Sequence, residues 1–348
     1  MKYKKTFVVG AFGYINNQLD GQTIKTRNVY RLLETRYKGQ LSYFDTLQTR
    51  KKPLSLFQLI FQLLICRRLI LMPCRGNLTF FFPFAFFMSK ILRFEIIIIC
   101  IGGWQYEYFT GIQGFKKHTL QMKCCKAIKA HLPEMQFLHS ILVNHCGFKN
   151  SEVFPNFRFF QQMPIVNNQG ALRLVFMARI RQEKGYPMVF EALDKLKGKG
   201  VNVSMTFYGQ INDADKDHFF SLLDQHKDNC TYEGELNPAN ITERLNQYDI
   251  MLFPTHYFGE GFPGTILDSF IAGIAVIATE WKHAREFIED GKVGYIVPFD
   301  SEVDIMVEKI LYLDQHRDIL KEMKQNSLEE ANKYSDEVAW EVLSKYLQ

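Results

Sequence analysis

The sequence predicts an α/β protein made of two doubly wound domains, each with a parallel sheet covered by helices on both faces. Its 348 residues suffice for two domains at roughly 100–200 residues each. Strand patterns alternate with helical patterns, and the alternation restarts after residues 158–170, a polar segment that contains Pro164 and lacks periodicity. We therefore expect a first domain over 1–165 and a second over 166–334, with a last helix at 335–348 that could pack back on the first.

The first domain is expected to open with a strand at 6–9. Its lysines and apolar residues resemble a weak signal peptide, but Gly10 and Gly13 interrupt the stretch and no small-residue cleavage site follows. The segment 95–101 is rich in isoleucine and apolar on both faces, as a buried parallel strand requires. The other expected elements are strands at 69–72 and 151–154, helices at 23–33, 54–65 and 79–92, and a short strand with a helix within 134–146.

Residues 53–106 form the most apolar part of the chain. Its longest runs without a charged residue, 53–66 and 76–89, have 14 residues each, whereas a membrane span needs roughly 20. We therefore exclude a spanning segment but not attachment to a membrane surface. In the expected helix 54–65, three polar residues share one face and leave a broad apolar face: Ser55, Gln58 and Gln62. Packing of that apolar face on the chain's own sheet is favoured over a membrane contact.

The second domain repeats the alternation, with no repeat at the level of single residues. Pro187 fits the first position of a helix that continues to residue 197, because the N–H that proline lacks has no helical partner there. The expected strands are 172–177, 203–208, 231–232, 250–253 and 275–279, and the other expected helices are 217–225, 241–246, 265–272 and 303–313. Ligands of such sheets bind beyond the carboxyl ends of the strands, so the loops after the strands are the places to look for a site.

The charge and cysteine content narrow the function classes. A formal net charge of +5 and a pI near 8.7, without a dense basic run, make nucleic acid a poor candidate partner. An anionic small molecule or a membrane surface remains compatible with this charge. The seven cysteines are odd in number and form no Cys-x-x-Cys pair, which argues against a disulfide framework and a zinc site. A reducing compartment, the cytoplasm, fits best.

Two loops of the second domain could hold an anion. The loop after 172–177 places Arg179 and Lys184 beside the start of the next helix, although on charge alone these could equally be two solvated cations. The loop after 250–253 contains three glycines that allow the backbone to approach a ligand closely: Gly259, Gly261 and Gly264. The helix that begins near Thr265 directs free N–H groups at the same ligand, so the loop and the helix together can hold a diphosphate.

Two acids belong to this second loop and its helix. Thr265 and Asp268 have the spacing of a capping box, and the helix dipole favours an acid in the first turn, so a structural role explains Asp268. Glu260 lies among the glycines, where no structural role is evident, and we interpret it as a site residue. His256 is interpreted as a loop residue rather than a catalyst, because the nine histidines show no ligand spacing.

Motifs for metals and cofactors do not hold up. Asp213-x-Asp215-x-Asp217 could suggest a calcium loop or a metal-binding acid motif, but the sixth loop position, where a calcium loop needs glycine, is His218. We interpret these acids as N-terminal residues of the following helix. The glycines after the first strand lack the third glycine of a dinucleotide-binding fingerprint, and no Walker loop is present. We therefore expect no metal and no cofactor.

The second half resembles the nucleotide-sugar-binding domain of the retaining glycosyltransferases of family four, which have the GT-B fold of two Rossmann-like domains facing a cleft. Six blocks in the family's order carry the resemblance: Arg179…Glu183-Lys184-Gly185, Tyr208-Gly209, Tyr232-x-Gly234, Asp249 to Thr255, Glu260-Gly261-Phe262-Pro263…Asp268-Ser269…Ala272-Gly273, and Glu286 to Gly294. The first half matches more weakly, at Asp20-Gly21-Gln22-Thr23, Gly102-Gly103-Trp104 and Gly147…Pro155-Asn156.

The resemblance implies roles for single residues. Arg179 and Lys184 would neutralise the donor diphosphate as the glycosidic bond breaks, and Glu260 would lie near the donor-sugar hydroxyls as the first acid of a paired-acid motif. Asp268 takes the place of the second acid, usually glutamate, which holds the ribose hydroxyls. The other implied donor-binding residues are Gly209, Gly261, Phe262, Pro263, Gly264 and Thr265. The first-domain cleft candidates are Gly21, Gly103 and Trp104, and where many relatives place a histidine this chain has Gly103-Trp104-Gln105.

The implied function is transfer of a hexose, with retention and without a metal, from a nucleotide-diphosphate sugar to a saccharide or lipid-linked saccharide, in the biosynthesis of a cell-surface polysaccharide. The donor would bind mainly to the second domain and the acceptor would enter from the first. The implied partners are the nucleotide sugar, the acceptor and the inner face of a membrane, and nucleic acid is not among them. Two alternatives stay open: a GT-B nucleotide-sugar epimerase and a catalytically silent binding subunit.

Overall fold

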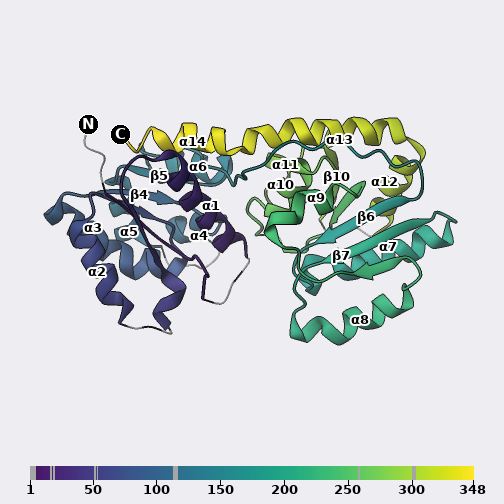
Figure 1. Cartoon of the computed structure of the whole chain (residues 1–348), viewed down its shortest axis with the longest axis horizontal. Helices are drawn as coiled ribbons and strands as arrows, with labels where there is room; N and C mark the ends of the chain where they lie inside the picture. The colour runs from purple at the N-terminus through teal and green to yellow at the C-terminus, as the bar shows by residue number, and fades with distance from the viewer. Residues whose placement is uncertain are drawn as a thin grey trace. The chain divides into compact units, whose positions relative to one another are not determined.

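The computed structural model describes residues 5–15, 18, 20–50, 52, 54–112, 117–257, 259–299 and 303–348. Contacts divide the chain into two compact units, Met1–Phe159 with Tyr334–Gln348 and Phe160–Lys333. The chain therefore passes into the second unit a few residues before the expected division at 165/166, and its last helix packs with the first unit (Figure 1).

The first unit contains a five-stranded parallel sheet with the strand order β2-β1-β3-β4-β5 (Figure 1). Its strands are β1 (Thr6–Gly10), β2 (Leu41–Asp45), β3 (Arg68–Leu71), β4 (Glu95–Ile99) and β5 (Ala130–Leu132). The isoleucines of β4 are all buried, as expected for a strand inside a parallel sheet covered on both faces.

One strand of this sheet is not predicted, and two expectations for it are wrong. The edge strand β2 is not predicted from the sequence, because three of its five residues are exposed or half-buried and give no clear apolar pattern. The short strand expected within 134–146 lies earlier, at β5. The strand expected at 151–154 does not form: Ser151 makes an isolated bridge to His131, and the Phe154 N–H donates to the Pro133 carbonyl at 2.7 Å, beyond the end of β5.

The helices of the first unit are α1 (Gly21–Arg36), α2 (Ser55–Ile65), α3 (Phe82–Leu92), α4 (Gln105–Thr110), α5 (Thr119–Lys126), α6 (Gln136–Asn144) and α14 (Asp336–Ser344). A π-helical turn, Asn77–Phe81, leads into α3. Asp20 caps α1 in a reciprocal capping box with Thr23, and this fixes where the loop after β1 ends. One core cluster joins α1 and α14 to the sheet and includes Val29, Leu33, Ile70, Ile97, Ala339 and Leu343.

The second unit contains a six-stranded parallel sheet with the order β11-β10-β9-β6-β7-β8. Its strands are β6 (Leu172–Met177), β7 (Val203–Tyr208), β8 (Cys230–Tyr232), β9 (Ile250–Phe253), β10 (Ala275–Thr279) and β11 (Gly294–Val297). The bounds of β6, β7, β9 and β10 are those expected from the sequence. β11, a four-residue strand that begins with Gly294, is not predicted.

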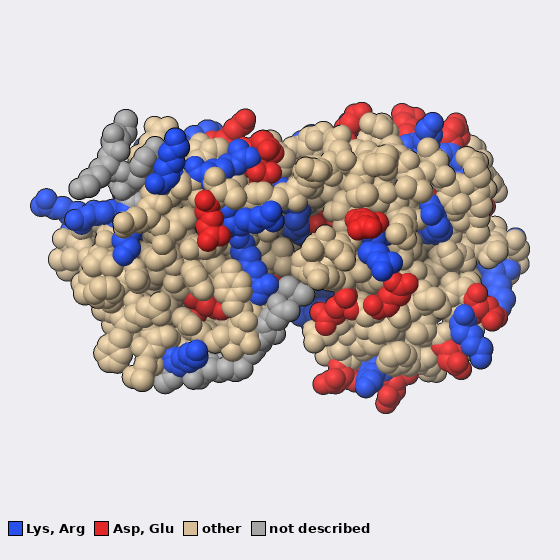
Figure 2. All heavy atoms as spheres, viewed as in Figure 1, with Lys and Arg blue, Asp and Glu red and all other residues tan. Residues whose placement is uncertain are grey.

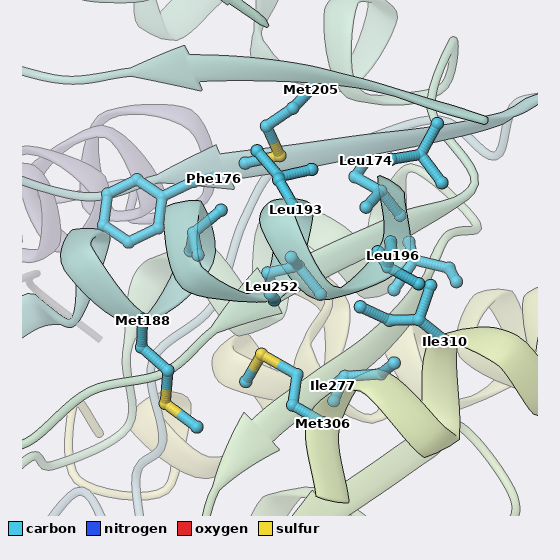
Figure 3. Packing of buried hydrophobic residues seen from close by; sticks show 14 of the residues in the cluster. Leu174, Phe176, Met188, Leu193, Leu196, Met205, Leu252, Ile277, Met306 and Ile310 are labelled. Carbon is cyan, nitrogen blue, oxygen red and sulfur yellow. The ribbon is translucent and has the colours of Figure 1, made fainter. Parts of the chain in front are cut away.

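The helices of the second unit are α7 (Tyr186–Gly198), α8 (Lys216–Gln225), α9 (Ile241–Leu245), α10 (Gly264–Ile271), α11 (Ala284–Phe287), α12 (Val303–Gln315) and α13 (Arg317–Ala331). Figure 3 shows how α7 and α12 pack on the sheet: Leu193 and Leu196 of α7 and Ile310 of α12 gather with Leu174 of β6 and Ile277 of β10. Such close packing on one sheet face holds the strand ends, and the loops after them, in place.

Two further findings concern the membrane and the cysteines. In the described part of the chain, no helix is both long and apolar enough to cross a bilayer. All seven cysteines are free thiols, and six of them are buried, whereas Cys74 is exposed.

Candidate functional site

The second-unit sheet has its switch point between β6 and β9. From β6 the chain proceeds to β7 and β8 on one side, whereas β9, β10 and β11 lie on the other. The loops that leave the carboxyl ends of β6 and β9 therefore diverge and leave room for a ligand between them. These two loops, 178–185 and 254–263, are the ones that the sequence singled out.

Gly185 brings the two loops into direct contact. Its φ is +82°, and a Cβ at this position would lie 1.8 Å from the Pro254 carbonyl oxygen, so only glycine fits. The His256 N–H donates to the Glu183 carbonyl at 2.8 Å, two residues after Pro254 and two residues before Gly185. The backbone of the first loop is thus locked on the second, and the side chains that both carry are held near one another.

Lys184 and Glu260 form an ion pair across these loops. Both side chains are mostly buried, and the Lys184 ammonium also lies 5.2 Å from the centre of the Tyr257 ring. The hydroxyl of Thr255, a fully buried residue, donates to Glu260 Oε1 at 3.3 Å. The structure therefore brings together two of the three predicted catalytic residues, which are separated by more than 70 positions in the sequence.

Arg179, the third predicted catalytic residue, is exposed and makes no hydrogen bond or ion pair with the described residues. Its backbone position is nevertheless fixed. Gly209 follows β7 with a φ of +132°, and a Cβ there would lie 1.9 Å from the Ala178 carbonyl oxygen. The predicted donor-binding residue Gly209 thus serves the close approach of the loops after β6 and β7.

Asp215 binds the backbone of the Lys184 loop. The sequence predicts for it only the role of an acid at the start of a helix. It is buried, and its carboxylate accepts hydrogen bonds from the Gln182 N–H at 3.1 Å and from Asn212 Nδ2 at 2.9 Å. Tyr186, at the start of α7, donates to the same carboxylate at 3.5 Å, and burial together with this acid raises the pKa of Tyr186 to about 12. Asp215 is therefore a positioning residue that local sequence pattern does not reveal.

The start of α10 differs from the expected capping box. Pro263 is the N-cap and provides no side-chain hydrogen bond, while the Thr265 hydroxyl donates to the Met177 carbonyl at 2.8 Å. Thr265 thus fastens α10 to the end of β6, and the first turn of α10 has no side-chain cap. Asp268 lies buried in the second turn rather than at the cap, so the capping role that we expected for it is wrong.

The remaining donor-site residues differ in exposure. Gly261 and Gly264 are partly exposed on the loop. The Phe262 ring is buried and stacks on Phe287 at 4.0 Å between centroids, with the two planes 4° apart. Its side chain therefore anchors the loop in the core, and only its backbone remains available to a ligand.

Two loops leave the first-unit sheet near its own switch point, between β1 and β3. Gly21 is exposed at the start of α1, directly after the Asp20 cap. Trp104 follows β4, packs edge-on against Tyr108 with centroids 5.4 Å apart, and lies 5.8 Å below the Arg75 guanidinium. Gln105, the next residue of this loop, is buried and accepts a hydrogen bond from the Cys100 thiol at 3.1 Å, so its side chain points away from solvent.

A buried ion pair holds the Gly102–Trp104 loop and was not found from the sequence. The Gly102 N–H donates to Glu134 Oε2 at 2.7 Å, and Lys25 Nζ lies 3.1 Å from Glu134 Oε1. Burial lowers the pKa of Lys25, while the Glu134 carboxylate opposes this shift. Glu134 stands two residues after β5, and its position at a strand end is the one signal that could have pointed to it.

The described residues include side chains of the types that bind metal ions. Among the residues that the structure describes, no group of three or more histidine, cysteine or acidic side chains is arranged to hold an ion. Of the acids in the Asp213 to Asp217 run, Asp215 is occupied with the Lys184 loop as stated above.

The region that contains this site matches a known protein family. A family model described as glycosyl transferases group 1 matches residues 159–330, which cover the whole second-unit sheet and both site loops. Residues 159–330 belong to the glycosyl transferases group 1 family. The Lys184 and Glu260 loops, β6 to β11 and α10 all lie within the group 1 match.

Several curated relatives that match part of this chain are named as glycosyltransferases or mannosyltransferases. A putative colanic acid biosynthesis glycosyltransferase, WcaL of Salmonella typhimurium, is 27% identical over 133 residues, 36% of this chain and 32% of WcaL. The amylovoran biosynthesis glycosyltransferase AmsK of Erwinia amylovora is 22% identical over 183 residues, 51% of this chain and 44% of AmsK. A phosphatidyl-myo-inositol mannosyltransferase of Mycolicibacterium smegmatis is 25% identical over 129 residues, 37% and 32% of the two chains. The matches thus span between about a third and under half of these relatives.

Solved structures match over the whole chain. HepE of Anabaena superposes with a TM-score of 0.74 at 12% identity and covers 99% of both chains. A glycosyltransferase of Rickettsia africae superposes with a TM-score of 0.71 at 15% identity, covering 99% of this chain and 98% of its own. At such low identity the likeness concerns the fold, and it confirms the GT-B fold with its two Rossmann-like units.

Proposed function

We propose that this chain is a retaining glycosyltransferase that moves a sugar from a nucleotide-diphosphate donor to a saccharide or lipid-linked saccharide. The observation that carries the proposal is the Lys184–Glu260 pair at the switch point of the second-unit sheet, next to the uncapped first turn of α10. At the carboxyl-terminal edge of the sheet, a cation and free helix N–H groups can bind the phosphates of a phosphorylated sugar, and a carboxylate can accept hydrogen bonds from its hydroxyls.

The donor diphosphate would replace Glu260 as the partner of Lys184. In the ligand-free site the carboxylate neutralises the ammonium, and a diphosphate brings more negative charge to the same place. Glu260 is then free to accept hydrogen bonds from the sugar hydroxyls, while exposed Arg179 can reach the phosphates from the opposite end of its loop. Charge that develops on the leaving diphosphate is met by fixed cations and helix N–H groups, a task that requires no metal.

The substrates can be narrowed from the relatives. WcaL and AmsK are named for colanic acid and amylovoran biosynthesis, and this supports a role in building a bacterial surface polysaccharide. The mycobacterial relatives act, by their names, on a phosphatidylinositol lipid, and this supports a lipid-linked acceptor. HepE has been solved with UDP and with UDP-glucose, so uridine diphosphate sugars are the first donors to test.

The test is to incubate the protein with a panel of nucleotide sugars, with and without acceptors extracted from bacterial membranes. Transfer predicts release of nucleoside diphosphate only when the acceptor is present, and NMR of the product should show the anomeric configuration of the donor. Conversion of the sugar without acceptor would instead identify a nucleotide-sugar epimerase. Nucleotide binding in a thermal-shift assay without either reaction would identify a silent binding subunit.

The reaction would take place in the cytoplasm, at the inner face of the membrane. Free cysteines suit the reducing cytoplasm, where nucleotide sugars are made available to such enzymes. A lipid-linked acceptor would bring the protein to the inner face of the membrane as a peripheral protein.

A further inference from the structure

Two helices of the first unit carry a second apolar stripe that no part of the described chain covers. Leu59 and Leu63 of α2, and Phe82 and Ala85 of α3, are buried. On the other side of the same helices, large apolar side chains are exposed at helical spacing: Leu56, Phe57, Ile60, Phe61, Leu64 and Ile65 around α2, and Phe80, Phe84, Phe87 and Ile91 around α3. We call these ten residues the apolar face.

The apolar face is unusual for its density. Of the 22 large apolar side chains exposed in the described part of the chain, 11 lie between Leu54 and Ile91, and Phe57 and Phe80 are 72% and 79% exposed. Scattered exposed apolar residues are ordinary, but a contiguous group of this kind marks a surface that meets something apolar. The sequence-based expectation that the apolar side of α2 packs on its own sheet therefore accounts for only Leu59 and Leu63.

Topology puts α2 and α3 on one face of the sheet. The crossovers from β2 to β3 and from β3 to β4 proceed in the same direction through the order β2-β1-β3-β4-β5, while the crossover from β1 to β2 proceeds in the opposite direction. Because such crossovers are right-handed, α2 and α3 lie together and α1 lies on the other face. Figure 1 shows α2, α3 and α5 near one another, away from α14.

The charge around the apolar face has one sign. Residues 46–94 contain eight lysines and arginines and no acid. Five of these cations are exposed: Lys52, Arg67, Arg75, Lys90 and Arg93. Of the two helices between β4 and β5, α4 carries half-buried Glu107, and α5 adds exposed Lys123 and Lys126 beside exposed Leu120. In Figure 2 the surface over α2 and α3, at the left edge of the view, is tan with blue side chains beside it.

We infer that the apolar face is a docking surface for an anionic lipid bilayer. Phenylalanine and leucine side chains would enter the boundary between head groups and acyl chains, and the surrounding cations would contact the lipid phosphates. A second copy of the chain fits poorly, because pairing two such faces would bring their cations together. Neither α2 nor α3, at 11 residues each, is long enough to span, so the contact is peripheral. This inference rests on the first unit alone and does not require the transfer reaction.

The experiment is co-sedimentation of the full chain with vesicles of phosphatidylglycerol and phosphatidylcholine at low salt, compared with vesicles of phosphatidylcholine alone. We expect binding to the anionic vesicles that weakens in high salt. Phe57→Ser with Phe61→Ser, and separately Phe80→Ser with Phe84→Ser, should each lower the partition coefficient roughly tenfold. Phe220→Ser, at an exposed phenylalanine of α8 in the second unit, is the matched control and should change nothing.

Two further measurements separate the outcomes. Phe57→Trp should show a blue-shifted emission on vesicle addition while Phe220→Trp does not, which reports insertion rather than surface adsorption. Arg67→Gln with Lys90→Gln should weaken anionic-vesicle binding roughly tenfold and reduce its salt dependence. Absence of wild-type binding at low salt, or binding as strong as that of the wild type by both phenylalanine double variants, overturns the inference. A dimer in light scattering that these same variants dissociate, without vesicle binding, would assign the face to a second copy instead.

Discussion

The two units have parallel sheets with a switch point, but they fix the loops at that edge in different ways. In the second unit Gly185 and Gly209 press against backbone carbonyls, and a Cβ would lie 1.8 Å or 1.9 Å from the oxygen. In the first unit Gly21 has no atom within 4 Å of a Cβ position, and the nearest atom to that of Gly102 is a Trp104 carbon at 3.8 Å. First-unit loops are instead held by side chains, such as Glu134 on the Gly102 N–H.

This difference explains where a family signature can be read. A contact between two backbones admits one residue type, so Gly185 and Gly209 leave a pattern in the sequence. A contact made by side chains can be built from many residue pairs, so the first unit carries no equally specific pattern. The family match accordingly begins at residue 159, where the first unit gives way to the second.

Substitution of one glycine in each unit tests this difference most directly. Gly185→Ala should destabilise the second unit by roughly 3–6 kcal/mol, because a methyl group at positive φ also overlaps the Pro254 carbonyl. The matched change in the first unit, Gly21→Ala at the exposed start of α1, should change the free energy of unfolding by less than about 1 kcal/mol and in the stabilising direction. Urea denaturation of both variants provides the measurement. An equal decrease in the free energy of unfolding of both variants would show that the two glycines contribute equally to stability.

The next largest effect is expected on catalysis. Lys184→Ala or Arg179→Ala should lower turnover by roughly 10²–10³-fold, the loss typical of one preorganised electrostatic contact in the transition state. Lys38→Ala, at an exposed lysine after α1 in the first unit, is the control and should retain wild-type turnover. Steady-state kinetics, with the donor that the nucleotide-sugar panel identifies, provide the measurement. Unchanged kinetics in either site variant would remove that residue from the site.

Glu260 tests whether the second-unit pair serves folding or substrate recognition. Glu260→Ala should lower activity by at least roughly tenfold through loss of contacts to the donor sugar. Its melting temperature should stay within about 2–4 °C of the wild type, because the Lys184 ammonium keeps its contact with the Tyr257 ring and because charges held for substrate binding often reduce stability. Differential scanning calorimetry and the transfer assay measure the two effects separately. A variant that unfolds, or that keeps full activity, contradicts the assignment.

Sequence patterns predicted the second-unit sheet well because its strands are buried and continuously apolar. The strands that were missed, β2 and β11, are short or half-exposed at the sheet edge. α13 was missed because its many charged residues hide the buried Leu320 and Met323. In each case tertiary packing selects a conformation for which the local pattern is weak.

Among the predicted site residues, Lys184 forms an ion pair with Glu260, and Gly209 lies against the Ala178 carbonyl. The sequence did not identify Asp215 or Glu134, whose partners are backbone N–H groups more than 30 residues away. It also predicted a helix-cap role for Asp268, but α10 begins earlier, after Pro263, and Asp268 lies in its second turn. Long-range hydrogen bonds and the exact start of a helix depend on the fold, and no local spacing encodes them.

The first unit should be sensitive to acid through His131. This residue of β5 is fully buried beside Phe109 and Phe148, and burial lowers its pKa from 6.5 to about 3. The unfolded chain therefore binds a proton below pH 6.5 that the folded chain does not, so stability is full above pH 6.5 and falls until about pH 3. The loss at pH 5 should be about 2 kcal/mol. His131→Asn should reduce the difference in unfolding free energy between pH 7.5 and 5, whereas exposed His145→Asn should not.

The smallest effect is expected from removal of divalent metal, and it sharpens the comparison at the second-unit site. A metal-dependent transferase needs carboxylates free to bind an ion that bridges the diphosphate. Here Asp215 is occupied by the Gln182 N–H and Asn212, and no group of three or more acidic, histidine or cysteine side chains in the described part of the chain is arranged to hold an ion. Fixed cations and the start of α10 can meet the diphosphate charge in place of an ion. Turnover should therefore stay within about twofold of its starting value after exhaustive chelation, measured with and without added Mg²⁺ or Mn²⁺. Loss of activity that only a metal restores would show that the ion, and not Lys184 with Arg179, neutralises the leaving group.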